Sequence, residues 1–186
     1  ICTEVIKKKF TEGSEKVLSE EPKDENRRIS AEITEFALEL LEGSKDIKSA
    51  MNMLLMRIGK RFRLSAVSVR EYGNRDIPEL SYLWSNMEAP NTEGTASYIS
   101  AEERRRIRED FSKNQILEIS DIETLPKQGA LYKLYSTVNV KALYQCPFIS
   151  EGQVFGYIAY IDTKQREWSE TEKHSLSLIS RFAPPL

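Results

Sequence analysis

The feature that most constrains the fold is the stretch from Lys141 to Asp162, in which two apolar runs flank a short polar turn. Both runs are rich in aromatic and β-branched residues, and the turn at residues 150–153 has the sequence Ser-Glu-Gly-Gln. Such runs on either side of a glycine-containing turn predict an antiparallel β-hairpin. Pro147 lies inside the first run and cannot donate a backbone hydrogen bond. It therefore marks an edge position or the end of regular pairing.

Apolar spacing and helix-capping residues predict the elements around this hairpin. Asp46 has the residue type of an N-cap, and two capping boxes begin at Ser100 and Ser169. The predicted helices cover residues 26–42, 46–58, 100–113, 125–138 and 169–182. The predicted strands outside the hairpin cover residues 64–72, 80–84 and 116–122.

Strands that follow one another through short turns pair antiparallel, so this order of elements predicts the α+β class. We expect a central antiparallel sheet of five or six strands with helices on both faces. The longest strands with apolar residues on both parities should lie at its centre. These are the strands at residues 64–72, 140–149 and 154–162.

Composition limits the broad class of the protein. The 186 residues carry a net charge of −2, which gives no general attraction to nucleic acid or to an anionic membrane. No apolar run approaches the roughly 18 residues that span a bilayer. Two cysteines far apart favour a reduced, cytoplasmic setting. Residues 1–28 are polar and predict a helical or partly ordered connector before a domain at residues 29–186. The start at Ile1 leads us to expect a piece of a longer chain.

Residues with catalytic chemistry are scarce. His174 is the only histidine and falls on the polar side of a predicted helix, so a histidine-based triad or a multi-histidine metal site is not expected. Cys146 lies in an apolar strand and is expected to be a buried structural thiol; an enzyme acting through Cys146 is the alternative. The basic run Arg104–Arg108 has acidic neighbours, which favours a solvated helix face over nucleic-acid or phosphate binding. We expect no enzymatic activity, no cofactor and no metal.

Aromatic side chains supply the candidate ligand-binding residues. Tyrosine combines an apolar ring with a polar tip, which suits the lining of a small-molecule pocket. Alternation places two aromatics on one strand face, and helical spacing brings two more to an adjacent surface. A plain core or a dimer face is the alternative for the same residues. The candidates are Tyr82, Trp84, Tyr132, Tyr135 and Tyr144.

Taken in order, several of these features resemble a GAF domain, a sensory module of signalling proteins. The resemblance covers residues 29–182 and implies an antiparallel sheet with the terminal helices on one face. The ligand cavity would lie on the other face, approached by residues 85–122 and 125–138. The residues that carry the resemblance are Asp46, the Val67-Ser68-Val69 strand, the stretch from Val140 to Phe148 with Pro147, then Gly152, Gly156 and the Trp168-Ser169-x-x-Glu172 helix start.

The resemblance implies a cytoplasmic sensory domain of a bacterial signal-transduction protein. Such a domain would bind an unknown small molecule and relay the signal to an output domain, for example a diguanylate cyclase or a histidine kinase. Bilin-binding members attach their chromophore to a cysteine, and this chain has none in the segments that would cover the cavity. We also expect a homodimer through the terminal helices, with Ile29 and Phe36 at the contact. The alternative is a ligand-free dimerisation and relay module.

Overall fold

One antiparallel sheet organises the molecule. The computed structural model describes residues 10–12, 28, 31, 32, 35, 46–73, 77–86, 99–113 and 115–182. Six strands lie in the order β1-β4-β5-β6-β2-β3, and every neighbouring pair is antiparallel. The order confirms that the two hairpin strands and the strand predicted over residues 64–72 lie inside the sheet. The strands are β1 (Phe10–Glu12), β2 (Ala66–Tyr72), β3 (Pro78–Ser85), β4 (Gln115–Ile119), β5 (Ala142–Ser150) and β6 (Gln153–Asp162).

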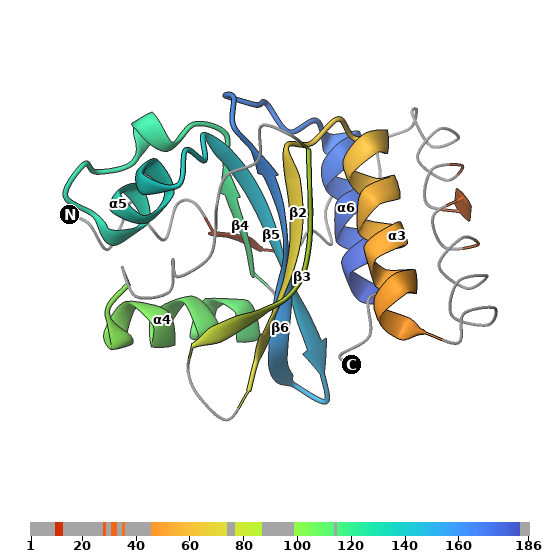
Figure 1. Cartoon of the computed structure of the whole chain (residues 1–186). Coiled ribbons are helices and arrows are strands. Elements are labelled where there is room, and N and C mark those ends of the chain that lie inside the picture. The colour runs from red at the N-terminus through yellow and green to blue at the C-terminus, as the bar shows by residue number, and fades with distance from the viewer. Residues whose placement is uncertain are drawn as a thin grey trace.

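Helices cover both faces of the sheet, which confirms the predicted α+β class. The long helices α3 (Ile47–Arg61) and α6 (Glu170–Phe182) lie side by side on one face (Figure 1). The other face is covered by α4 (Ala101–Ser112) and α5 (Ala130–Thr137), with the short 3₁₀-helix η2 (Ile122–Thr124) between them in the chain. We refer below to the helix face, which carries α3 and α6, and the pocket face, which carries α4 and α5.

The predicted helix starts are confirmed by their hydrogen bonds. The Asp46 side chain accepts from a backbone N–H in the first turn of α3, at 3.1 Å. In α4 the Glu103 N–H donates to Ser100 Oγ at 3.2 Å, and the Ser100 N–H donates to the Glu103 carboxylate at 3.1 Å. Ser169 and Glu172 form the same reciprocal pair ahead of α6, at 3.2 and 3.0 Å. Each pair satisfies N–H groups that the first turn of a helix leaves without a partner.

The central hairpin is as the sequence predicts. Glu151 and Gly152 have φ values of 51° and 75°, the left-handed conformation that tight hairpin turns require at both positions. β5 pairs with β6 along its whole length, whereas its pairing with β4 ends at Gln145. Pro147 therefore lies beyond the last residue of β5 that pairs with β4, where its missing N–H costs no hydrogen bond to that strand.

Two predicted elements have different limits in the structure. The strand expected over residues 116–122 ends at Ile119, because Asp121 accepts from the Glu123 N–H at 2.9 Å and turns the chain into η2. The helix expected over residues 125–138 begins only at Ala130. A residue before proline is disfavoured in the helical region, and Leu125, which precedes a proline, is accordingly extended.

The N-terminal segment contributes a strand that the sequence did not predict. β1 pairs with β4 at the sheet edge, with Phe10 opposite Leu117. Residues 1–28 were expected to be a helical or partly ordered connector, and three residues give too short a pattern to distinguish a strand. The helix predicted over residues 26–42, including Ile29 and Phe36, falls largely outside the described residues.

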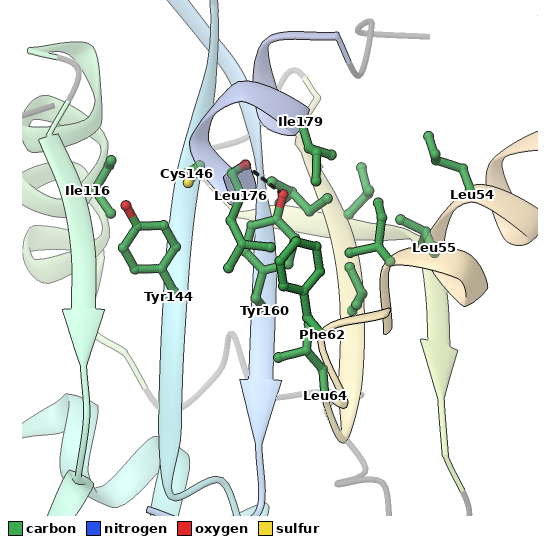
Figure 2. Close-up of a cluster of buried hydrophobic side chains, with 14 of the residues drawn as sticks. Leu54, Leu55, Phe62, Leu64, Ile116, Tyr144, Cys146, Tyr160, Leu176 and Ile179 are labelled. Carbon is green, nitrogen blue, oxygen red and sulfur yellow. Dashed lines mark hydrogen bonds between the residues drawn. The ribbon is translucent and has the colours of Figure 1, made fainter. Parts of the chain in front are cut away.

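The sheet separates two apolar cores. The core on the helix face includes Leu55 and Ile58 of α3, Tyr160 of β6 and Leu176 of α6, all fully buried. Figure 2 shows Tyr160 among these side chains, with its hydroxyl donating to the Leu176 carbonyl oxygen at 2.9 Å. The pocket face has its own buried cluster around Phe111, which includes Leu117, Ile119, Leu131 and Leu143. Strands covered on both sides explain why the sequence is apolar on both parities.

Replacing Gly156 with alanine should destabilise the fold. A Cβ atom at Gly156 would lie 2.2 Å from the Arg70 backbone oxygen in the neighbouring strand, and backbone cannot move aside without breaking the pairing. We expect Gly156→Ala to lower the free energy of unfolding by about 1–3 kcal/mol. Gly73→Ala is the matched control, since no atom lies within 4 Å of its added Cβ, and its effect should stay within about 0.5 kcal/mol. Equal urea midpoints for the two variants would contradict this packing.

Candidate functional site

A pocket lies on the pocket face, between the sheet and helices α4 and α5. It encloses about 470 Å³ of space between atoms, a figure that includes space open to solvent. A pocket on the face opposite the terminal helices is where the sequence analysis placed one. The lining residues are Arg70, Tyr72, Pro78, Ile99, Arg104, Ile107, Leu134, Tyr135, Gln145 and Tyr157.

Two polar side chains enter the pocket from the sheet itself. Arg70 of β2 and Gln145 of β5 are 8% and 6% exposed, so a cation and an amide are held inside the fold. Gln145 Nε2 donates to the Tyr135 hydroxyl at 3.2 Å, which joins β5 to α5 across the cavity. Burial raises the pKa of Tyr135 well above its usual value, although Gln145 and Arg70 lower it in part. The hydroxyl is therefore protonated at neutral pH.

Aromatic rings form the apolar wall beside these groups. The Tyr72 and Tyr157 ring centroids lie 6.3 Å apart, and Phe111 packs behind Tyr157 at 5.4 Å. The Arg108 guanidinium lies over the Tyr72 ring, 4.7 Å from its centroid. Such a cation–π contact fixes the ring and adds positive charge near the pocket.

Helix α4 supplies the remaining cation. Arg104 lies in the first turn of α4, and its Nη1 donates to the backbone oxygen of Ile99, just ahead of the capping box. Ile107, one turn further along, faces the same cavity. The spacing of three residues brings both side chains to one side of the helix.

The five aromatic residues predicted to line one pocket are divided between the two faces. Tyr135 lines the pocket. Tyr132, like Tyr135, packs against the core of the pocket face, but it is not part of the pocket lining. The Lys127 ammonium lies 4.2 Å from the centroid of the Tyr132 ring. Tyr144 belongs to the core of the helix face, and Tyr82 and Trp84 are partly buried against that core. One pocket cannot contain side chains from both sides of a sheet, so the expected grouping was wrong.

The contacts of these three residues show what holds them on the helix face. Trp84 packs directly on α3, where a Cβ atom at Gly59 would meet its ring at 1.8 Å. The Tyr144 hydroxyl lies 3.0 Å from Ser177 Oγ of α6. Tyr82 pairs across the strands with Val69, whose side chain is in the same core. These aromatics stabilise the packing of α3 and α6 on the sheet.

Arg70 and Gln145 are pocket residues that the sequence analysis did not propose, and Arg104, expected on a solvated helix face, lines the pocket as well. Arg70 shares its parity in β2 with Ala66 and Tyr72, so a charged residue stands on a side of the strand that is otherwise buried. Gln145 similarly interrupts an apolar strand. A polar residue within a strand buried on both faces is the signal that could have indicated them.

The residues considered for catalysis lie away from the pocket. Cys146 is buried on the helix face, with its Sγ 4.0 Å from Ser177 Oγ, while His174 is exposed on α6. The described part of the chain contains no group of three or more His, Cys, Asp or Glu side chains placed to hold a metal ion. Among the described helices, none is both long and apolar enough to cross a membrane.

Comparison with solved structures identifies the architecture. The GAF domain of the cyanobacteriochrome TePixJ superposes with a TM-score of 0.63 at 15% identity, covering 75% of this chain and 87% of that one. A phycocyanobilin-bound GAF domain from a cyanobacterial phytochrome gives 0.65 at 13% identity, covering 84% and 90%. The chain has the GAF fold.

Other comparisons extend or limit this result. A domain assigned to a two-component sensor histidine kinase of Sinorhizobium meliloti 1021 also has this fold, with a TM-score of 0.57 at 13% identity over 74% of this chain and 88% of that one. No protein-family model matches the sequence. No curated protein shows significant similarity to it. At such low identities the agreement shows the GAF fold, and function has to be argued from the pocket.

Stability should fall at alkaline pH because buried acids must ionise. Burial raises the pKa of Cys146 from 9.0 to about 12, although hydroxyl groups on α6 lower it in part. A pKa that is higher in the folded state gives stability that is complete below about pH 9 and is lost as pH rises towards 12. Burial raises the pKa values of Tyr144 and Tyr160 too, which adds the same dependence above about pH 10.

The thiol contribution can be measured separately by urea unfolding between pH 8 and 10. In a Cys2→Ser background, Cys146→Ala should flatten the fall in unfolding free energy by up to about 1.4 kcal/mol per pH unit. The Cys2→Ser variant alone is the control. Parallel curves for the two proteins would show that the Cys146 thiol does not titrate on unfolding.

Proposed function

We propose that this chain is the sensory domain of a signal-transduction protein, and that it binds a small molecule in the pocket between β2, β5, β6, α4 and α5. Binding would bias an output domain elsewhere in the protein, such as a diguanylate cyclase or a histidine kinase. The domain would act in the cytoplasm and would bind its ligand without catalysing a reaction. The observation that carries the proposal is that two buried polar side chains, Arg70 and Gln145, enter a pocket with apolar walls from the sheet.

The polar pair supports ligand binding because burying such groups is costly. A domain that needed only a rigid core would be more stable with apolar residues at these two positions. Sites for small molecules characteristically combine apolar walls with a few placed polar groups. The phytochrome GAF domain with the same fold holds phycocyanobilin. In this chain the described thiol faces the opposite side of the sheet, which favours a ligand held without a covalent bond.

The proposal of an output domain draws on the arrangement of α6 and on the comparisons. The inner side of α6 contacts β5 through Ser177, so a change in that strand would be felt by the helix. A domain of the same fold belongs to a sensor histidine kinase. The absence of catalysis is supported by Cys146, a buried and protonated thiol, and by the exposed position of His174.

A homodimer through the terminal helices is the second part of the proposal, and it also serves the alternative of a ligand-free relay module. Three large apolar side chains of α3 are exposed on this face of the molecule: Ile47 at 51%, Met53 at 45% and Met56 at 36%. Met53 and Met56 are three residues apart and so lie on one side of the helix. Burying them against a second copy would remove apolar surface from water.

Blocking the pocket should abolish ligand binding without unfolding the domain. Screening a metabolite panel by thermal shift should find compounds that raise the melting temperature. A compound at about 100 times its dissociation constant adds roughly 2.7 kcal/mol, or about 5–10 °C for a domain of this size. Ile107→Trp would fill the cavity and should abolish the shift. Lys133→Trp, on the exposed side of α5, should retain it. Shifts that survive Ile107→Trp would place binding elsewhere.

The dimer can be tested by light scattering across a concentration series. The double variant Met53→Lys/Met56→Lys should weaken self-association at least tenfold, because it places charges in an apolar contact. Ser136→Lys, exposed on α5 across the sheet, should associate as the unaltered chain does. A monomer at high micromolar concentration before any substitution would rule out the homodimer.

A further inference from the structure

The described pocket lining is rich in hydrogen-bond donors and positive charge. Arg70 from β2 and Arg104 from α4 bring guanidinium groups, which only donate hydrogen bonds. Arg108 stands over the Tyr72 ring and adds a third cation beside the cavity. None of the described lining residues is an aspartate or glutamate. Glu71, which neighbours Arg70 in β2, points to the helix face. Its carboxylate accepts a hydrogen bond from the Ser81 hydroxyl, and its charge adds to burial in raising the pKa of Tyr82.

The hydrogen bond between Gln145 and Tyr135 leaves a further donor for a ligand. Gln145 Nε2 donates and the Tyr135 oxygen accepts, at 3.2 Å. The phenol is protonated because burial raises its pKa, so its own hydrogen remains to be donated. The second N–H of the Gln145 amide is also a donor. Donors from two elements, α5 and β5, thus accompany the cations in one cavity.

The rest of the lining is apolar and partly flat. Tyr72 and Tyr157 offer ring surfaces, while Ile107 and Leu134 offer aliphatic ones. A ligand that matches this lining has an acceptor-only anionic group at one end and a compact apolar body at the other. A carboxylate has that chemistry, since its two oxygens accept about four hydrogen bonds and match the fork of a guanidinium.

We propose that the pocket binds a small monocarboxylate with an aromatic or branched aliphatic body. Arg70 and Arg104 hold the carboxylate, Tyr135 and Gln145 complete its hydrogen bonds, and the Tyr72–Tyr157 wall holds the body. This inference rests on the proposed sensory function and specifies its ligand class. Tyr135 then orients the ligand. Arg104, in the first turn of α4, forms an ion pair between the ligand carboxylate and the helix that covers the site.

Calorimetric titration of the full 186-residue chain can test the ligand class with matched pairs. The acids are phenylacetate, indole-3-acetate and 3-methylbutanoate, and each is compared with its primary amide, which keeps the shape but not the charge. At least one acid should bind, and its amide should bind at least tenfold more weakly, because hydrogen bonds to a charged group are about twice as strong as neutral ones. Phenyl phosphate is included to distinguish a phosphate site from a carboxylate site.

Variants with close controls assign the effect to the pocket. Arg104→Gln should weaken binding of the acid at least tenfold and leave the amide within twofold, whereas Arg105→Gln, exposed on the same helix, should change neither. Tyr135→Phe removes only a hydroxyl and should weaken the acid about fivefold. Tyr132→Phe, outside the lining, should bind as the unaltered chain does.

The outcomes separate this inference from the function on which it rests. Equal binding of acid and amide, or binding that ignores Arg104→Gln, overturns the carboxylate class. The sensory function would stand in that case if Ile107→Trp still abolished binding. Tighter binding of phenyl phosphate also overturns the class, in favour of a phosphate ester. If these compounds and the whole metabolite panel fail to bind, both the inference and the proposed function are overturned.

Discussion

The guanidinium of Arg166 is the contact on which the helix face depends. Its nitrogens lie 3.1 Å from Asp162, 2.7 Å from the Phe62 backbone oxygen and 2.5 Å from Glu172, and its Cζ atom lies 4.9 Å from the Trp168 ring centroid. These partners belong to the end of β6, the end of α3 and the start of α6. One largely buried cation thus fixes both long helices against the central hairpin, and removing it would leave two carboxylates without the positive charge that they share.

Fixing α6 in this way decides which residues of β5 can reach a ligand. Burial alone would raise the pKa of Glu172, but the Ser169 N–H and Arg166 lower it below the usual value, so the capping carboxylate stays ionised. With α6 in place, Tyr144 and Cys146 are covered by that helix. Gln145, between them in the strand, must then face the opposite side, because successive side chains in a strand alternate. The pocket is therefore a consequence of packing on the far side of the sheet.

Local signals in the sequence were sufficient for the elements but not for the lining of the site. A cap such as Asp46 or the turn at Glu151–Gly152 depends on a few neighbouring residues, and these predictions were confirmed. In β5 both parities are apolar, so periodicity cannot tell which side each helix covers. The pairing of β2 with β3 shifts between Val69 and Arg70. Val69 lies opposite Tyr82, which faces the helices, whereas Arg70 lies opposite Leu80, two positions earlier in β3. Such a bulge depends on contacts between strands and has no local sequence signal here.

The adjacent positions of Tyr144 and Gln145 give the domain a short physical connection between its two faces. Gln145 is bonded to Tyr135 in the pocket, and Tyr144 lies 3.0 Å from Ser177 of α6. A ligand that accepted a hydrogen bond from the Gln145 amide would pull on β5, the strand that packs against α6. On the buried side of α6, the small polar Ser177 and Ser180 stand beside the large apolar Leu176 and Ile179. Arg166 contacts Glu172 in the first turn, so a displacement of α6 would be smallest at that end. A movement pivoting on that turn would be largest at the far end of α6.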